Sequence, residues 1–380
     1  MHLKRLRLFQ YRNIKEQEIV PSEGTTLFIG QNGQGKTNLL EAMYFLAFGR
    51  SFRTASPKEC IQHGEQDCCI EGTVVQGSIS RDLKVWISKK EKKLFLHGKT
   101  VSLDAFVGNL HLLAFTYNHL NIVRKSPGDR RAFLDRAMAT IYPGHIGNLA
   151  VYGRALKQRN KVLSAVRDGR RILDESLLDS WDETLVKHGT RIILNRMRYV
   201  DQMKQNLPEG LFGSENLKMH YQSNVMEKSN GLYGIEEVYK GLLLSLRDYD
   251  RRIGSTSIGP HRDDLKLFVN GKSLVDFGSA GQQRSSLLAL YFSQMEIHRG
   301  VHGFYPVFLV DDAEAELDEQ RLNTFLRYIS QRTQTFLTSA KDFPIHKVCG
   351  EIRFMTVKVN DPHPVSPKYD DENFTFAYRL

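Results

Sequence analysis

The feature that most constrains this chain is a glycine-rich run at residues 30–37, Gly-Gln-Asn-Gly-Gln-Gly-Lys-Thr. The run fits the pattern G-x-x-x-x-G-K-[ST], in which glycines let backbone N–H groups converge on phosphate oxygens. An apolar stretch, residues 26–29, precedes it, and a longer one, residues 38–48, follows it. We therefore expect a buried strand, a phosphate-binding loop, and a helix whose positive N-terminal end faces a nucleotide.

This run predicts individual roles. The Lys36 ammonium group is expected to reach the β- and γ-phosphates, and the Thr37 hydroxyl to bind Mg²⁺. The alternative is a structural strand-to-helix turn without a ligand, which the flanking apolar segments disfavour. The nucleotide-binding set expected from the loop is Gly30, Gln31, Asn32, Gly33, Gln34, Gly35, Lys36, Thr37 and Asn38.

Two adjacent carboxylates follow a second apolar run. Residues 306–310 read as a buried parallel strand, and Asp311 and Asp312 stand where that strand reaches the ligand edge of an α/β sheet. Asp311 is expected to hold Mg²⁺, and Asp312 to act with Lys36 in catalysis by polarising the attacking water. An aspartate that only caps the next helix is the alternative. The strand at 334–338, with Ser339 after it, is expected to lie beside the 306–310 strand, with its terminal hydroxyls placed to sense the γ-phosphate.

Composition limits the partners. A formal net charge of +10 fits a polyanion such as nucleic acid or an acidic lipid surface. The charged N-terminus, the lack of a run of about 18 apolar residues and the low cysteine content predict a cytoplasmic protein with no membrane partner. Cys60, His63, Cys68 and Cys69 lack the CxxC spacing of a zinc site.

The hydrophobic pattern of the sequence changes along the chain. Residues 1–147 alternate short apolar runs with turns, and strands are expected at 85–87 and 94–96. Residues 148–253 show apolar residues at three-or-four spacing, which predicts two or three long helices with breaks near Asp168-Gly169 and Gly189. Residues 254–380 return to strand texture, with a hairpin at 265–275 and helices at 285–296 and 319–331. The prediction is an α/β domain in two sequence halves with a helical insertion.

The short run Ser279, Ala280, Gly281, Gln282 and Gln283 leads into an apolar helix. It resembles the signature motif of the ABC-type ATPases, S-x-G-Q before a helix, which in that family serves the nucleotide of the opposite subunit. Glu316-Leu317-Asp318 is similar to the family's next loop, so Asp318 is the expected D-loop residue. Gly278 departs from the usual apolar residue before the signature, Ala280 from a glycine or arginine, and Asp312 from the glutamate of transporters.

A closer resemblance, to the RecF family of bacterial recombination-repair ATPases, spans almost the whole chain. It rests on residues 9–14, 30–42, 49–53, 130–135, 156–160, 259–265, 281–284 and 310–318. The resemblance implies an ABC-type P-loop ATPase head, an inserted helical (coiled-coil-like) arm, and an ATP-dependent homodimer that clamps double-stranded DNA and ss/ds junctions. It also implies RecR and RecO as partners in recombinase loading at gaps, and adenine near Tyr11, Arg12 and Asn13. Because the Asp312 side chain is shorter than glutamate, we expect slow, switch-like hydrolysis.

No helix-turn-helix or zinc-finger pattern is present in the sequence, so DNA is expected to be read through phosphates and shape. Three other classes share some motifs: a transporter ATPase subunit, an SMC-like tether and a small-molecule kinase. The transporter subunit would need membrane subunits, and the SMC-like tether would need far longer heptad arms. The kinase would have no use for the signature loop. The candidate DNA contacts are Arg50, Arg53, Arg154, Lys157, Arg159 and Lys161.

Overall fold

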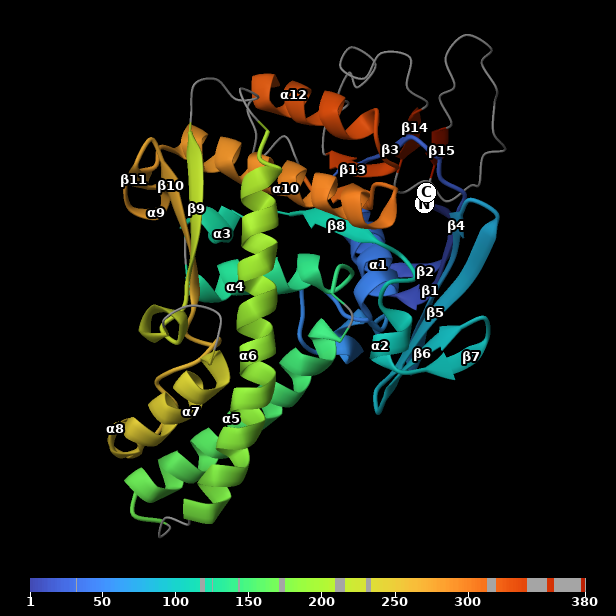
Figure 1. Ribbon diagram of the computed structural model, residues 1–380. Helices are drawn as coiled ribbons and strands as arrows, with labels where there is room; N and C mark the ends of the chain where they lie inside the picture. The colour runs from blue at the N-terminus through green and yellow to red at the C-terminus, as the bar shows by residue number, and fades with distance from the viewer. Residues whose placement is uncertain are drawn as a thin grey trace. The chain divides into compact units, whose positions relative to one another are not determined.

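The computed structural model describes residues 1–31, 33–116, 120–124, 126–142, 144–170, 175–208, 216–229, 234–312 and 319–339, and the backbone of 354–358 and 377–379. The chain forms two compact units (Figure 1). Unit 1 contains Met1–Leu120 and Gln294–Leu380, and unit 2 contains Asn121–Ser293. None of the helices described is both long and apolar enough to cross a bilayer.

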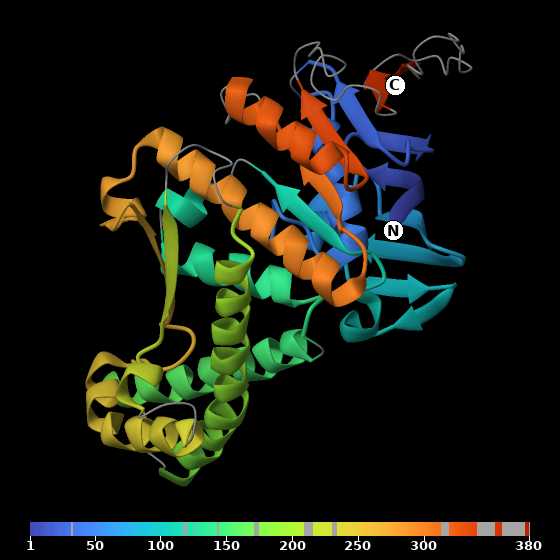
Figure 2. The same ribbon diagram turned by 45° about the horizontal axis from the view of Figure 1, so that its top comes forward.

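A parallel sheet of strand order β15-β14-β3-β13-β12-β8 forms the first layer of unit 1 (Figure 2). Its strands are β3 (Thr25–Ile29), β8 (Leu112–Phe115), β12 (Val307–Val310), β13 (Thr335–Ser339), β14 (Phe354–Lys358) and β15 (Ala377–Arg379). Every residue of β3, β12 and β13 is buried, as expected of strands covered on both faces. Because β13 pairs with both β3 and β12 in parallel, these three strands end at the same edge.

An antiparallel sheet of order β2-β1-β4-β5-β6-β7 forms the second layer of unit 1. Its strands are β1 (His2–Tyr11), β2 (Ile14–Ile19), β4 (Asp67–Gln76), β5 (Ile79–Ser88), β6 (Lys92–Leu96) and β7 (Lys99–Val101). The expected antiparallel pair is confirmed, with Val85 opposite Leu94. His97 and Gly98 then turn the chain with φ values of 48° and 76°, as a type I′ turn requires.

Helix α1 (Lys36–Phe48) is buried between these two sheets. Its core cluster includes Phe28 and Phe336 of the parallel sheet, and Leu6 and Val85 of the antiparallel sheet. A helix that is apolar around nearly its whole circumference needs such a position, because it has no face to present to water. The other helices in the described residues of unit 1 are η1 (Pro57–Cys60), α2 (Leu103–Phe106), α12 (Glu319–Ser330) and the last turns of α10 (Ala280–His302).

Two long helices, α5 (His145–Arg167) and α6 (Glu175–Gln205), pack side by side in unit 2 (Figure 1). The predicted break is confirmed after α5, where Gly169 has φ 69°. The predicted break at Gly189 is wrong, since α6 continues through this residue without interruption. A β-carbon at Gly189 would lie 2.7 Å from the ring of Tyr239 and 3.0 Å from that of Tyr152, so this glycine serves close packing.

A three-stranded sheet, β11-β10-β9, completes unit 2 with several short helices. The Asn270-Gly271 turn is confirmed, with φ 51° and 80°. The hairpin's second strand is shorter than predicted, because Leu274 starts a helix. The strands and shorter helices described in unit 2 are α3 (Asn121–Arg124), α4 (Pro127–Met138), β9 (Leu217–Gln222), η3 (Met226–Lys228), α7 (Ile235–Ser245), α8 (Arg247–Ile253), β10 (Asp264–Val269), β11 (Lys272–Ser273) and α9 (Leu274–Phe277).

Unit 2 is wider than the helical insertion expected at residues 148–253, since it also takes in α4, β10 and most of α10. The segment 259–265, Gly-Pro-His-Arg-Asp-Asp-Leu, is one reason. The Asp264 carboxylate pairs with Arg130 of α4 at 2.6 Å, and the Arg196 guanidinium of α6 donates to the Pro260 carbonyl at 2.7 Å. These buried bonds tie β10 to helices on both sides of the expected boundary.

Candidate nucleotide site

The glycine-rich loop (residues 30–37) connects β3 to α1. Gly33 and Gly35 have φ values of 85° and 105°, in the left-handed region that favours glycine. The φ of Gly35 strains any residue with a β-carbon, and such an atom would also lie 2.8 Å from the Asn13 side chain. Helix α1 has no side-chain cap and no acidic residue in its first turn, which leaves its first N–H groups oriented for an anion.

The Lys36 ammonium group lies against the loop itself. Its Nζ donates to the carbonyls of Gly30 at 2.6 Å and Gln31 at 3.1 Å. The Gln34 side chain braces the loop from the other end, accepting from the Gln31 N–H at 2.7 Å. The cation is therefore held at the loop by its own backbone; Asn32 lies outside the described residues.

The carboxyl ends of β3, β12 and β13 bring three oxygen-bearing side chains together. The Thr37 hydroxyl donates to Asp311 Oδ1 at 3.0 Å, and the Thr338 hydroxyl donates to the same oxygen at 2.8 Å. Burial, aided by the nearby charge of Asp312, raises the pKa of Asp311, while the two hydroxyls oppose that rise. A hydroxyl beside a buried carboxylate is the oxygen set that Mg²⁺ prefers, so Thr37 and Asp311 fit this ion.

Asp312 adopts a backbone conformation that is rare for residues other than glycine, with φ 49°. Its N–H donates to the Thr338 hydroxyl at 2.9 Å, which fixes the chain direction just past β12. Asp312 is only partly buried, in contrast to Asp311. Adjacent acids thus occupy different environments: one is held by hydroxyls, and the other is accessible at the sheet edge.

Of the residues expected near adenine, Tyr11 is fully buried, Asn13 contacts the loop and Arg12 contacts helix α1. Asn13 donates to the Gln34 carbonyl at 3.2 Å and accepts from the Asn38 amide at 2.7 Å. Arg12 forms a bidentate pair with Glu41, at 2.7 and 2.9 Å. Sequence reasoning assigned Glu41 no role, although a single acid inside an otherwise apolar helix was a signal that it needs a buried partner.

The expected DNA contacts fall into three groups. Arg53 donates to the Asn38 side chain at 2.6 Å and so joins the nucleotide site. Arg159 is wrong as a DNA contact: it is fully buried and its guanidinium binds Asp182 at 2.6 Å and Asp250 at 2.7 Å. The remaining four, which are also exposed, are Arg50, Arg154, Lys157 and Lys161.

The signature-like run Ser279–Gln283 lies in unit 2 and forms the start of α10. The Ser279 N–H donates to Gln282 Oε1 at 3.0 Å, and the Gln282 N–H donates to the Ser279 hydroxyl at 3.2 Å. This reciprocal pair is a capping box, so α10 begins at Ala280, five residues before the predicted Ser285. Gly278 is explained too, because a β-carbon there would lie 2.4 Å from the Leu274 carbonyl oxygen. Asp318 lies outside the described residues.

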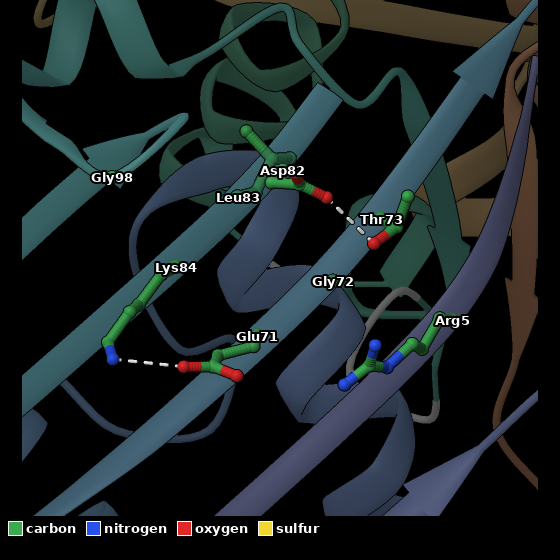
Figure 3. A pocket seen from close by; sticks show the side chains of 8 residues that line it. All are labelled: Arg5, Glu71, Gly72, Thr73, Asp82, Leu83, Lys84 and Gly98. Carbon is green, nitrogen blue, oxygen red and sulfur yellow. Dashed lines mark hydrogen bonds and ion pairs between the residues drawn. The ribbon is translucent and has the colours of Figure 1, made fainter. Parts of the chain in front are cut away.

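A pocket lies on the antiparallel sheet of unit 1 (Figure 3). Lys84 lies 2.9 Å from Glu71, and the Thr73 hydroxyl donates to Asp82 at 2.8 Å. Because these charged side chains neutralise one another, we assign the pocket no ligand. Its lining is Arg5, Glu71, Gly72, Thr73, Asp82, Leu83, Lys84 and Gly98.

The fold and the loop define a class of protein. A strand–glycine loop–helix unit lies beside a strand that ends in adjacent acids, and the helix packs against an antiparallel sheet. This is the ABC-type P-loop ATPase fold. The family model described as "RecF/RecN/SMC N terminal domain" matches residues 2–360. An Smc head domain from Pyrococcus furiosus shares the fold, with a TM-score of 0.54 at 14% identity over 95% of this chain and 94% of that one.

Within this class, the chain belongs to the RecF family. It is 36% identical to the DNA replication and repair protein RecF of Geobacillus kaustophilus, covering 89% of this chain and 92% of that one. Against the protein of the same name from Lactococcus lactis, the identity is 35% over the same shares. A solved RecF–ATP structure, described as part of the RecFOR pathway, superposes with a TM-score of 0.81 at 29% identity, covering 90% of this chain and 94% of that one.

Proposed function

We propose that this protein is an ATP-dependent DNA-binding protein of recombinational repair, in which slow ATP hydrolysis acts as a switch. The observation that carries the proposal is the convergence of Lys36, Thr37 and Asp311 at the carboxyl ends of β3 and β12. The solved RecF–ATP structure and the names of the curated relatives support the nucleotide and the repair process.

In this proposal the loop N–H groups and the start of α1 bind the phosphates, and Lys36 neutralises the β- and γ-phosphate charge. Thr37 and Asp311 hold Mg²⁺, which supplies further charge neutralisation when bound. Asp312 takes a proton from the attacking water, since it is the more accessible acid at this edge. Its short side chain keeps this step slow. Asn13 acts by holding the loop through the Gln34 carbonyl, and Arg12 by holding helix α1 through Glu41.

The capped start of α10 is proposed to bind the γ-phosphate of a second copy, so that ATP assembles a homodimer. Ser279 and Gly281 are the contacting residues, and Asp318 is proposed to join them from the D-loop. Phe277, just before this run, is 73% exposed. An exposed aromatic side chain beside a phosphate-binding helix start is typical of a surface that becomes buried on association.

Duplex DNA is proposed to bind the exposed face of α5. This helix contains no acidic residue in its 23 positions, and Arg154, Lys157 and Lys161 lie three and four residues apart, on one side. Arg50 is a further contact. RecR and RecO are the proposed partners, acting with this protein at ss/ds junctions of gaps to load recombinase, in line with the RecFOR pathway of the solved relative.

Sedimentation with ATP, with ADP and without nucleotide tests this function. The expected result is a monomer that dimerises only with ATP and more strongly with added duplex DNA. A chain that stays monomeric with ATP and duplex would overturn the dimer proposal and favour the kinase alternative. A duplex affinity that does not fall with salt would overturn the proposed phosphate readout on α5.

A further inference from the structure

Three histidines converge at the amino edge of the parallel sheet in unit 1, opposite the edge that carries Asp311. His111 comes directly before β8, while His298 and His302 lie one turn apart near the end of α10. Each offers a ring nitrogen, and the three nitrogens lie within 4.8 Å of one another. Neither the nucleotide site nor the DNA face uses these residues.

The backbone fixes the direction of the central ring. His298 Nδ1 lies 2.9 Å from the Phe304 carbonyl, so it carries the proton and donates. Its Nε2 is therefore the acceptor in the hydrogen bond with His111 Nδ1, 2.5 Å away, and a metal ion would take the place of the shared proton. A backbone carbonyl that orients the outer nitrogen of a histidine is the common second partner of metal-binding imidazoles.

Burial also favours the neutral form of these histidines. His111 and His298 are 7% and 5% exposed, so they have little access to water. Burial lowers the pKa of His111 to about 4 and that of His298 to about 3, with the neighbouring histidines adding to the effect. Neutral imidazole is the form that binds metal ions.

We propose that His111, His298 and His302 bind a transition-metal dication, with Zn²⁺ as the natural occupant. Three imidazoles with a fourth, open position suit zinc and its first-row neighbours rather than Mg²⁺ or Ca²⁺, which prefer oxygen. Bound at this place, the metal ties the last turn of α10 to the amino end of β8.

The geometry requires small movements. Zn–N bonds of about 2.0–2.1 Å at tetrahedral angles place ligand nitrogens about 3.3 Å apart. The 2.5 Å pair must open and the wider pairs must close, which ring rotations can supply. The Met1 amino group and Arg81 oppose the added charge, although burial lowers the pKa of that amino group and so reduces its positive charge.

The test is a titration of chelator-treated, tag-free full-length protein with Co²⁺, followed by displacement with Zn²⁺. Excess Mg²⁺ is present throughout to occupy the Thr37–Asp311 position. We expect one Co²⁺ per chain, with the visible spectrum of a tetrahedral nitrogen site that Zn²⁺ abolishes. His302→Gln and His298→Gln should each weaken binding at least about tenfold.

His63→Gln is the matched control, because His63 is an exposed histidine of the same unit. It should bind Co²⁺ as the unaltered chain does, and ATP binding should be unchanged in His302→Gln. An unaltered chain that binds no Co²⁺ below about 100 μM, or a His302→Gln protein with unchanged affinity and spectrum, would overturn the proposal. Failure of the metal site would leave the ATP and DNA proposals untouched.

Discussion

Two helix starts in this protein, those of α1 and α10, use small residues in opposite ways. Helix α1 follows Gly35 in a left-handed conformation and has no side-chain cap. Helix α10 follows Ser279, which exchanges two hydrogen bonds with Gln282. The first start leaves its N–H groups for a ligand, whereas the second satisfies one of them internally.

This difference indicates that the two helix starts have different roles in phosphate binding. The α1 start also has Lys36 and the Asp311 carboxylate beside it, so it has the groups needed to hold a nucleotide alone. The α10 start keeps the N–H groups of Ala280 and Gly281 and the hydroxyl proton of Ser279. That smaller set suits a contact that adds to an already bound phosphate, which is what a second copy of the chain would supply.

The largest expected effect is at the α1 side. Asp312→Asn removes the proposed base and should lower kcat for ATP hydrolysis about 10²–10⁴-fold. Since Lys36 and Thr37 are intact, ATP should still bind and the dimer should persist longer. Steady-state hydrolysis and dimer lifetime measure the two effects, with Asp104→Asn, an exposed acid of α2, as the control. Unchanged hydrolysis would show that Asp312 is not the base.

A large effect is also expected at the α10 side. Ser279→Arg places a long side chain over the helix start and should lower hydrolysis and ATP-dependent dimerisation about 100-fold. ATP binding to the monomer should remain, because α1 is unaltered. Nucleotide titration and sedimentation on the same sample separate the two. Normal hydrolysis by this variant would contradict the second-copy role of α10.

Substitutions of the α5 lysines, which are proposed to bind DNA phosphates without a helix start, should have an intermediate effect. Lys157→Gln and Lys161→Gln on α5 should each reduce the salt dependence of duplex binding by about 0.9 in the log–log slope. The affinity should fall several-fold at low salt and less at high salt. Lys187→Gln, an exposed lysine of α6, is the control. If all three variants behaved alike, the α5 face would not be the DNA surface.

The smallest effect concerns the capping box itself. Gln282→Ala and Ser279→Ala each break it and should each lower the free energy of unfolding by about 1 kcal/mol, measured by urea denaturation. If Ser279 also contacts a phosphate, Ser279→Ala should weaken ATP-dependent dimerisation more than Gln282→Ala. Equal dimerisation in both variants would limit Ser279 to a structural cap.

Errors in the sequence predictions have physical causes. The sequence predicts Arg159 as a DNA contact, but Asp182 and Asp250 reach its guanidinium from segments far along the chain. Gly189 was read as a helix break because glycine has low helix propensity. The helix persists because Tyr152 and Tyr239 occupy the space beside it. In both positions a partner distant in sequence outweighed the local signal.

The local chemistry of the protein follows from sequence alone: the β3–loop–α1 unit, the acids after β12, the Asn270-Gly271 turn and the paired long helices were all predicted. These depend on backbone sterics and hydrophobic periodicity within a few residues. Only the tertiary structure decided that Asn13 and Glu41 hold the loop and its neighbouring arginine, that Ser279 caps α10, and that His111 meets His298. The physical reason is that such contacts join residues from different elements, and packing alone determines which polar groups must satisfy one another once water is excluded.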